Sequence, residues 1–154
     1  MSVIVAAAAL ATLIQTSSGA DDVCYDRAVV GYIRHADHFV DLNNFLQPQA
    51  GVLMWGGRMD VDIEVEKVLA GPATPKSVKA RVVLTDLFSS KTPLMILLKE
   101  GPVDPDRDNT VQQWKGRFIP RASREFPWRI VAVETVRSGV ALDDPSLPPQ
   151  CSKP

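Results

Sequence analysis

The chain is poor in the residues and motifs that mark common enzymes. Its 154 residues include only two histidines and two cysteines, and only 6% of them are aromatic. It contains no G-x-S-x-G, no H-E-x-x-H and no glycine-rich phosphate loop. The usual sequence signatures of serine hydrolases, zinc peptidases and P-loop nucleotidases are therefore excluded, and we expect no cofactor.

The chain also lacks an excess of charge of one sign. Its formal net charge is −1, which gives no general attraction to nucleic acid or to anionic membranes. We therefore predict no nucleic-acid partner. The charge is uneven, with acidic residues at 103–109 and 60–66 and a basic segment at 114–137. The simplest interpretation of each segment is a solvent-exposed face.

No stretch is both long enough and apolar enough to predict a membrane span. The apolar run at residues 3–14 has about a dozen residues, whereas a spanning helix needs about 20. Ser18-Gly19-Ala20 then places small residues where a signal peptidase reads them. We predict that residues 1–20 are an export signal and that residues 21–154 form one periplasmic or extracellular domain. The alternatives are a membrane anchor or a buried helix, since no Lys or Arg precedes the run.

The two cysteines lie near the two ends of the predicted mature chain. Cys24 follows the predicted cleavage site closely, and Cys151 lies close to the C-terminus. In an oxidising compartment such a pair predicts a disulfide, for which the chain-entropy model gives at most about 5 kcal/mol. The alternative is two free thiols. Neither cysteine has a histidine or a further cysteine nearby, so we expect no zinc site there.

What the chain does contain is a set of alternating segments typical of β-strands. The clearest is DVDIEVEKVLAG at residues 60–71, in which Val61, Ile63 and Val65 alternate with acidic residues. The period of two predicts that the valines and the isoleucine face a core while the carboxylates face water. Most of this segment belongs to a long predicted strand at 52–69. The other predicted strands are 28–33, which continues across a kink at 38–42, then 77–84 and 128–136. The apolar run 94–98 fits a strand buried on both faces, and a short buried helix is the alternative that periodicity leaves open.

These strands predict an all-β fold. They do not alternate with helices, and about five strands with a long, bent early one fit a small Greek-key barrel of the OB type. Residues 106–126 are predicted to hold a short helix or a long loop. Residues 143–154 contain four prolines and are predicted to be an extended, irregular tail.

The chain resembles a known family of secreted OB domains. A cysteine is followed by an apolar strand with an internal glycine (VVGYI, 29–33), and a later strand ends in VEKVLAG (65–71). These features resemble netrin-like and tissue-inhibitor-of-metalloproteinases-like domains, in particular bacterial exported relatives, over residues 24–100. The resemblance implies a barrel with a disulfide-tied N-terminus. It does not imply inhibition, because family inhibitors begin with the zinc-chelating cysteine and three residues would precede Cys24 here.

Two clusters of residues are candidates for a metal ion. His35, Asp37 and His38 could ligate zinc, although exposed histidines are the simpler interpretation because a strand places His35 and His38 on opposite faces. The acidic loop 104–109 resembles the start of a calcium loop. It lacks the glycine at the sixth position and the glutamate at the twelfth. A solvated acidic loop is the simpler interpretation there.

The aromatic residues of the basic segment could form a binding groove. Trp114, Phe118, Phe126 and Trp128 are interleaved with arginines, as in the grooves by which OB barrels bind strands or sugars. For an exported protein, an anionic glycan or lipid head group would suit such a groove better than nucleic acid. Burial in the core is the simpler interpretation.

We therefore predict an exported, non-enzymatic interaction domain that binds a protein or an envelope component. The predicted contact residues are Trp55, Arg117, Arg121 and Arg124. One alternative is a small metal-dependent hydrolase that uses His35, Asp37 and His38. A second alternative is a protease inhibitor.

Overall fold

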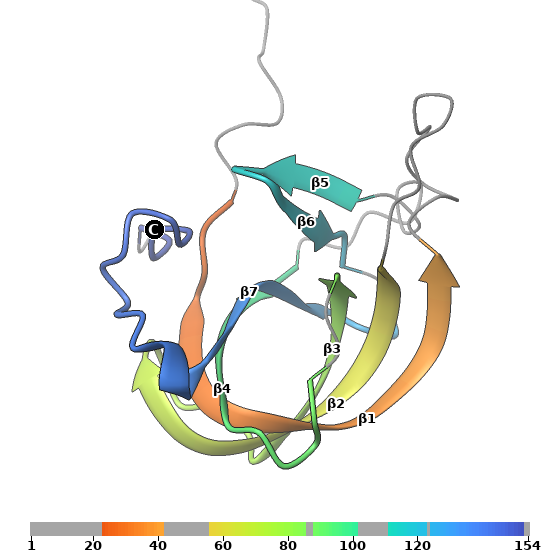
Figure 1. Ribbon diagram of the computed structural model, residues 1–154, viewed down its shortest axis with the longest axis horizontal. Helices are drawn as coiled ribbons and strands as arrows, with labels where there is room; N and C mark the ends of the chain where they lie inside the picture. Colours follow the sequence, from red (N-terminus) through yellow and green to blue (C-terminus); the bar gives the residue numbers. More distant parts are fainter. Residues whose placement is uncertain (1–22, 42–55, 86–87, 102–110, 123, 153–154) are drawn as a thin grey trace, which may run out of the picture.

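A computed structural model describes residues 23–41, 56–85, 88–101, 111–122 and 124–152, and within them the fold is all-β. A closed barrel of five strands forms the body of the molecule, as predicted (Figure 1). Its strands are β1 (Arg27–Asp41), β2 (Gly57–Ala70), β3 (Ser77–Leu84), β4 (Leu94–Glu100) and β7 (Trp128–Thr135).

The barrel closes in the order β1-β2-β3-β7-β4, with β4 pairing back to β1. All of these pairs are antiparallel except β3–β7, which is parallel. The parallel pair arises because the chain crosses from β3 to β4 before β7 returns between them. This arrangement is consistent with an OB-type barrel.

The inner faces of the strands form the main core. Val61 and Ile63 on β2 are almost fully buried and Val65 packs against them, as the alternation predicted. β1 is one continuous strand over the two segments that the sequence separates by a kink. Its register shifts at Gly31, where a Cβ would overlap the carbonyl oxygen of Glu64. The glycine therefore permits a close approach of β1 to β2.

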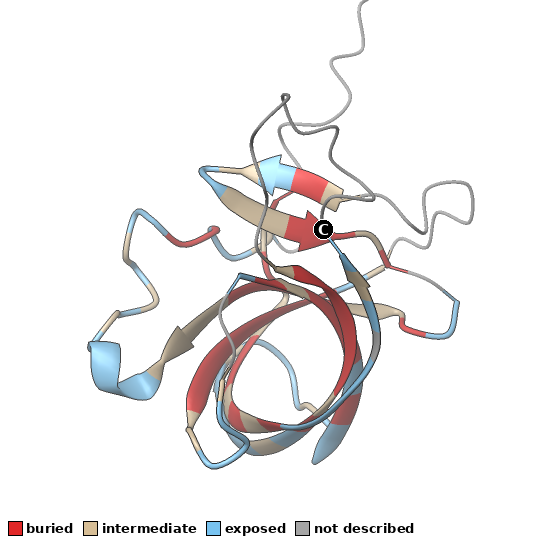
Figure 2. Cartoon of the chain, turned by 45° about the vertical axis from the view of Figure 1, so that its right-hand side comes forward, coloured by how far each residue is buried: buried red, intermediate tan, exposed pale blue. Residues whose placement is uncertain are grey.

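A second core lies outside the barrel. The outward residues of β4, Met95 and Leu97, are buried with Val131 of β7, Tyr25 of the N-terminal segment and Leu147 of the C-terminal segment. Figure 2 shows buried residues along the barrel wall and again in the small hairpin beside it. β4 is therefore buried on both faces, as its uninterrupted apolar run indicates.

The prediction of a short helix or long loop at 106–126 is wrong for residues 111–120. They form a hairpin of β5 (Val111–Trp114) and β6 (Arg117–Pro120). Its turn has positive φ at both Lys115 (44°) and Gly116 (78°), which matches the right-handed twist of the two strands. Lysine rarely adopts that conformation, so the turn was not evident from the sequence.

The prediction that all carboxylates of β2 face water is wrong for Asp60. It points outward from the barrel but is only 2% exposed. Phe126 packs over its ion-pair partner Arg81, 5.2 Å from the guanidinium carbon to the ring centre, and lines a small cavity together with Asp60. The segment before β7 therefore covers this part of the outer face.

Candidate functional site

The candidate site is an opening in the barrel wall between β3 and β7. These strands pair only at Ala80 with Trp128 and at Arg81 with Arg129, yet β3 runs on to Leu84 and β7 to Thr135. The other edge of β3 is paired with β2, and that of β7 with β4. Within the described residues, the facing edges at 82–84 and 130–135 therefore have no strand partner.

A cavity of about 410 Å³ occupies this opening. Leu84 and Ile130, which belong to the barrel core, and Phe88, which packs against it, form its apolar part. β6 lies against both β3 and β7, and the hairpin residues Gly116 and Phe118 line the outer side. The opening thus joins strand edges that have no strand partner in the described residues to an apolar interior.

Arg117 and Glu134 form an ion pair at the rim of the opening. The distance from Arg117 Nη2 to Glu134 Oε1 is 2.8 Å, and both side chains are about one-quarter exposed. Arg117 Nε also donates to the carbonyl oxygen of Ser146, at 3.4 Å. Arg117 therefore holds β6 against β7 and the C-terminal segment.

Two of the other predicted contact residues, Arg121 and Arg124, do not lie at this opening. Arg121 is half-buried and Arg124 is exposed, and neither lines the cavity. Trp55 lies outside the described residues, as does the acidic loop 104–109. Of the four predicted contact residues, only Arg117 is shown to line the candidate site.

The predicted aromatic groove does not form around these rings as one surface. Phe126 is buried against the Arg81 guanidinium, and Trp128 packs against the barrel core with the Arg27 guanidinium 4.4 Å from its ring centre. Phe118, in contrast, lines the opening. Trp114 packs against the second core, so the four rings lie at separate places.

A row of buried charged residues crosses the outer face of four strands. Asp60 faces Arg81, Arg81 faces Arg129, and Arg129 faces Lys99 in consecutive strand pairings. Each of the four is less than one-tenth exposed. The sequence does not predict this row, because charged residues at outward strand positions normally face water. The one signal in the sequence is that each of the four charged residues occupies an outward position of a strand. Their alignment in one row depends on the pairing of strands that are distant in the chain.

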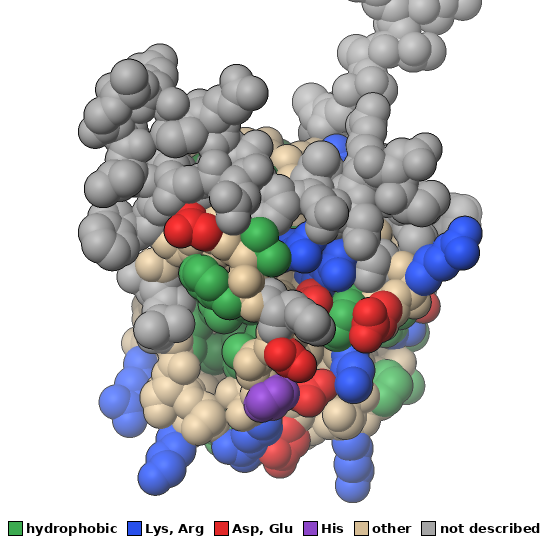
Figure 3. Space-filling model, turned by 90° about the vertical axis from the view of Figure 1, so that its right-hand side faces the viewer, with side chains coloured by type: hydrophobic (Ala, Val, Ile, Leu, Met, Phe, Trp, Pro, Cys, Tyr) green, Lys and Arg blue, Asp and Glu red, His purple; other side chains and the backbone are tan. Residues whose placement is uncertain are grey.

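The predicted metal cluster is only partly described. His35 and Asp37 are exposed on β1, opposite Asp62 and Asp60 of β2, and line a cavity of about 90 Å³. The side chain of His38 lies outside the described residues. Among the side chains that are described, no group of three His, Cys, Asp or Glu could hold a metal ion. Figure 3 shows acidic, basic and histidine side chains intermixed on this side of the molecule.

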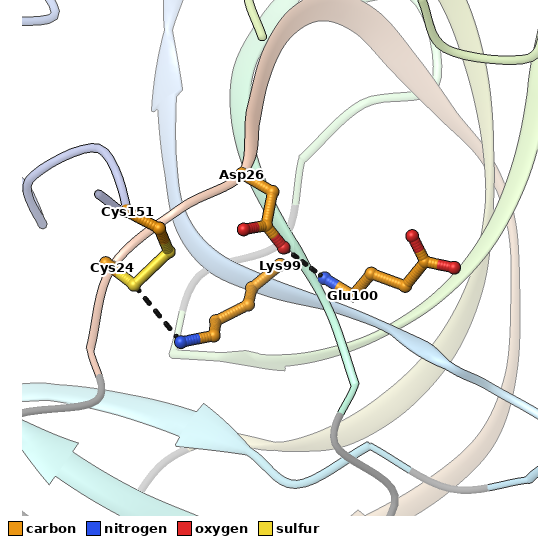
Figure 4. The surroundings of a disulfide bond; sticks show 5 residues. All are labelled: Cys24, Asp26, Lys99, Glu100 and Cys151. Carbon is orange, nitrogen blue, oxygen red and sulfur yellow. Dashed lines mark hydrogen bonds between the residues drawn. A yellow bond between two sulfur atoms is a disulfide. The ribbon is translucent and has the colours of Figure 1, made fainter. Parts of the chain in front are cut away.

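The predicted disulfide joins Cys24 to Cys151, with the two Cα atoms 4.9 Å apart. Figure 4 shows Lys99 pointing toward Cys24, and its Nζ lies 3.1 Å from the Cys24 Sγ. Asp26 accepts a hydrogen bond from the backbone N–H of Glu100 at 2.9 Å, which fixes the N-terminal segment to β4. A cavity of about 520 Å³ lies beside this region, and Cys151 lines it.

Comparison with known proteins identifies no relative of this chain. No family model matches the chain, no curated protein matches it, and no solved structure matches it. The described residues include no helix with the length and apolar character to cross a membrane.

Proposed function

We propose that the protein is an exported, non-enzymatic interaction domain whose opening between β3 and β7 binds an extended segment of a partner protein. The observation that carries this proposal is the pair of facing strand edges, residues 82–84 and 130–135, which have no strand partner in the described part of the chain. Backbone N–H and C=O groups at such edges are satisfied by another extended chain.

The chemistry of the opening supports a peptide as the occupant. Backbone pairing with the edges would supply affinity for any extended segment, and pockets for alternate side chains would supply specificity. Leu84, Phe88 and Ile130 offer apolar contacts for such side chains. The Arg117–Glu134 pair at the rim offers polar contacts where a segment would enter.

Export is supported by two independent features of the chain. The apolar run at residues 3–14, followed by Ser18-Gly19-Ala20, has the form of a cleaved signal. The Cys24–Cys151 disulfide fits an oxidising compartment, because disulfides persist mainly outside the cytosol.

Site-specific photo-crosslinking tests the proposal. A photoreactive phenylalanine replaces Val83, which lines the opening, in the oxidised protein that begins at Asp21. The matched control carries the same group at Lys79, an exposed outward position four residues earlier on the same strand. After irradiation in the host's envelope and secreted fractions, we expect a protein adduct from position 83 and none from position 79.

Hydrogen exchange then distinguishes strand pairing from other contacts. With a synthetic peptide that spans the crosslinked segment, amide exchange should slow at residues 82–84 and 130–135. A peptide that binds without slowing these amides would contradict the proposal. So would equal crosslinking from positions 79 and 83, or a small molecule as the only adduct at position 83.

A further inference from the structure

We infer that the Cys24–Cys151 disulfide is a site of directed thiol–disulfide exchange with a dithiol, in which Cys151 is attacked and Cys24 leaves. This inference is independent of the opening between β3 and β7. It rests on the different surroundings of the two sulfur atoms.

Lys99 makes the Cys24 sulfur the better leaving group. Its Nζ lies 3.1 Å from the Cys24 Sγ, and Lys99 as a residue is only 9% exposed. A neighbouring ammonium group stabilises a thiolate, and this stabilisation is screened little by water when the cation is buried. In disulfide exchange, a more stable leaving thiolate departs faster.

Both cysteines are half-buried, but only Cys151 borders a cavity from which a reductant would reach it. It lines the cavity of about 520 Å³, together with Arg27, Gly71 and Gln150, whereas Cys24 does not line it. Cys24 lies on the segment that leads into β1, and Cys151 lies on the C-terminal segment, which is bridged to it at Tyr25 and Gln150 (Figure 4). Access and leaving-group stability therefore favour the same direction of attack.

The exchange proceeds in two steps. A thiolate of the dithiol attacks the Cys151 Sγ and forms a mixed disulfide with it. The bond between Cys24 and Cys151 breaks, and its electron pair leaves with the Cys24 sulfur as a thiolate beside Lys99. The second thiolate of the dithiol then attacks the other sulfur of the same dithiol, which is bonded to Cys151 in the mixed disulfide, and Cys151 leaves as a thiolate. Two electrons pass from the dithiol, which ends as a disulfide, and its two protons pass to the cysteines or to water.

Reduction would remove the covalent attachment of the C-terminal segment. The remaining backbone attachments near it are the Tyr25 N–H to Pro149 carbonyl bond, at 3.0 Å, and the Cys151 N–H to Tyr25 carbonyl bond, at 2.8 Å. Leu147 packs in the second core with Tyr25. Exchange at this disulfide would therefore determine whether the segment that covers the outer face of β4 and β7 is covalently attached.

The rate of reduction by dithiothreitol tests the role of Lys99. We expect Lys99→Met to slow reduction of the oxidised protein several-fold, and Lys99→Arg to keep most of the wild-type rate. Lys79→Met is the control for loss of a lysine on the barrel. Lys79 is exposed, and it pairs with Asp62 of β2 rather than with the segments that carry the disulfide. Equal rates for wild type and Lys99→Met would overturn the inference.

A second measurement requires no change at Lys99. Brief exposure to glutathione, rapid acid quenching and peptide mass spectrometry identify the sulfur that carries the mixed disulfide, which we expect to be Cys151. In the single variants Cys151→Ser and Cys24→Ser, the remaining thiol is alkylated with iodoacetamide across a pH series. Cys24 should react at lower pH than Cys151. Glutathione found mainly on Cys24, or the reverse order of alkylation, would overturn the inference.

Discussion

Asp60 and Arg81 face each other across β2 and β3, with Asp60 Oδ1 and Arg81 Nε 2.8 Å apart and both side chains less than one-tenth exposed. An ion pair on the outer face of a barrel normally lies in water. Here the segment around Phe126 covers it, so the charges depend on one another rather than on solvent.

Loss of one partner of this pair should destabilise the fold strongly. Asp60→Ala removes the carboxylate and leaves the Arg81 guanidinium buried, which typically costs about 3–5 kcal/mol. Urea unfolding of the oxidised protein measures the change in the free energy of unfolding. Glu64→Gln is the control, because it breaks the exposed Arg34–Glu64 pair and should leave that free energy nearly unchanged. Similar losses for both variants would contradict burial of the Asp60–Arg81 pair.

The close approach of β1 to β2 at Gly31 should not tolerate a side chain. Gly31→Ala places a Cβ against the Glu64 carbonyl oxygen, a backbone atom that cannot move aside without shifting β2. We expect a loss of about 1–3 kcal/mol, as for other overpacked sites. Gly139→Ala meets nothing within 4 Å and bears only the strain of φ 69°, about 1 kcal/mol. Thermal unfolding of both variants should therefore show the larger loss for Gly31→Ala.

The attachment of the C-terminal segment should weaken at alkaline pH. Burial raises the pKa of the Tyr25 phenol above its ordinary value, which is about 10. Because the folded-state pKa lies above the unfolded one, the stability that Tyr25 contributes is full below the unfolded pKa. It is lost as pH rises through the folded pKa. The free energy of unfolding, measured with urea, should therefore fall above about pH 10, and Tyr25→Phe should reduce that fall. An unchanged alkaline response in Tyr25→Phe would assign the effect to another group.

The N-terminus of the exported protein discriminates the binding domain from the inhibitor alternative. We expect cleavage after Ala20, so that sequencing of the secreted protein begins at Asp21 and Cys24 is the fourth residue. Zinc chelation through a terminal cysteine would then be impossible. Ala20→Tyr, which places a bulky residue where the peptidase reads a small one, should leave the precursor uncleaved. A mature protein that begins at Cys24 would restore the inhibitor hypothesis.

Much of the barrel could be predicted because local alternation reports burial directly. Val61 and Ile63 recur every second residue and lie in the core, and the apolar run of β4 indicates a strand that is buried on both sides. The disulfide could be predicted because a pair of cysteines near the two ends of a chain with a predicted export signal is typically oxidised.

The missed features depend on contacts between distant parts of the chain. Asp60 is buried because residue 126 packs over its partner, and no local pattern near residue 60 reports that cover. The hairpin depends on a lysine in an unusual backbone conformation. The opening exists because β3 and β7 separate after one short paired stretch. Such a separation has no signature in either strand alone.

The burial of β4 on both faces limits how far the protein can be reduced in size. Met95 and Leu97 are covered by elements outside the five-stranded barrel, among them Ile119 of the hairpin and Leu147 of the C-terminal segment. A shortened version that kept only the barrel strands would display this apolar strip to solvent, where it would promote self-association. The hairpin and the C-terminal segment are therefore parts of the folding unit, and any engineered fragment must include them.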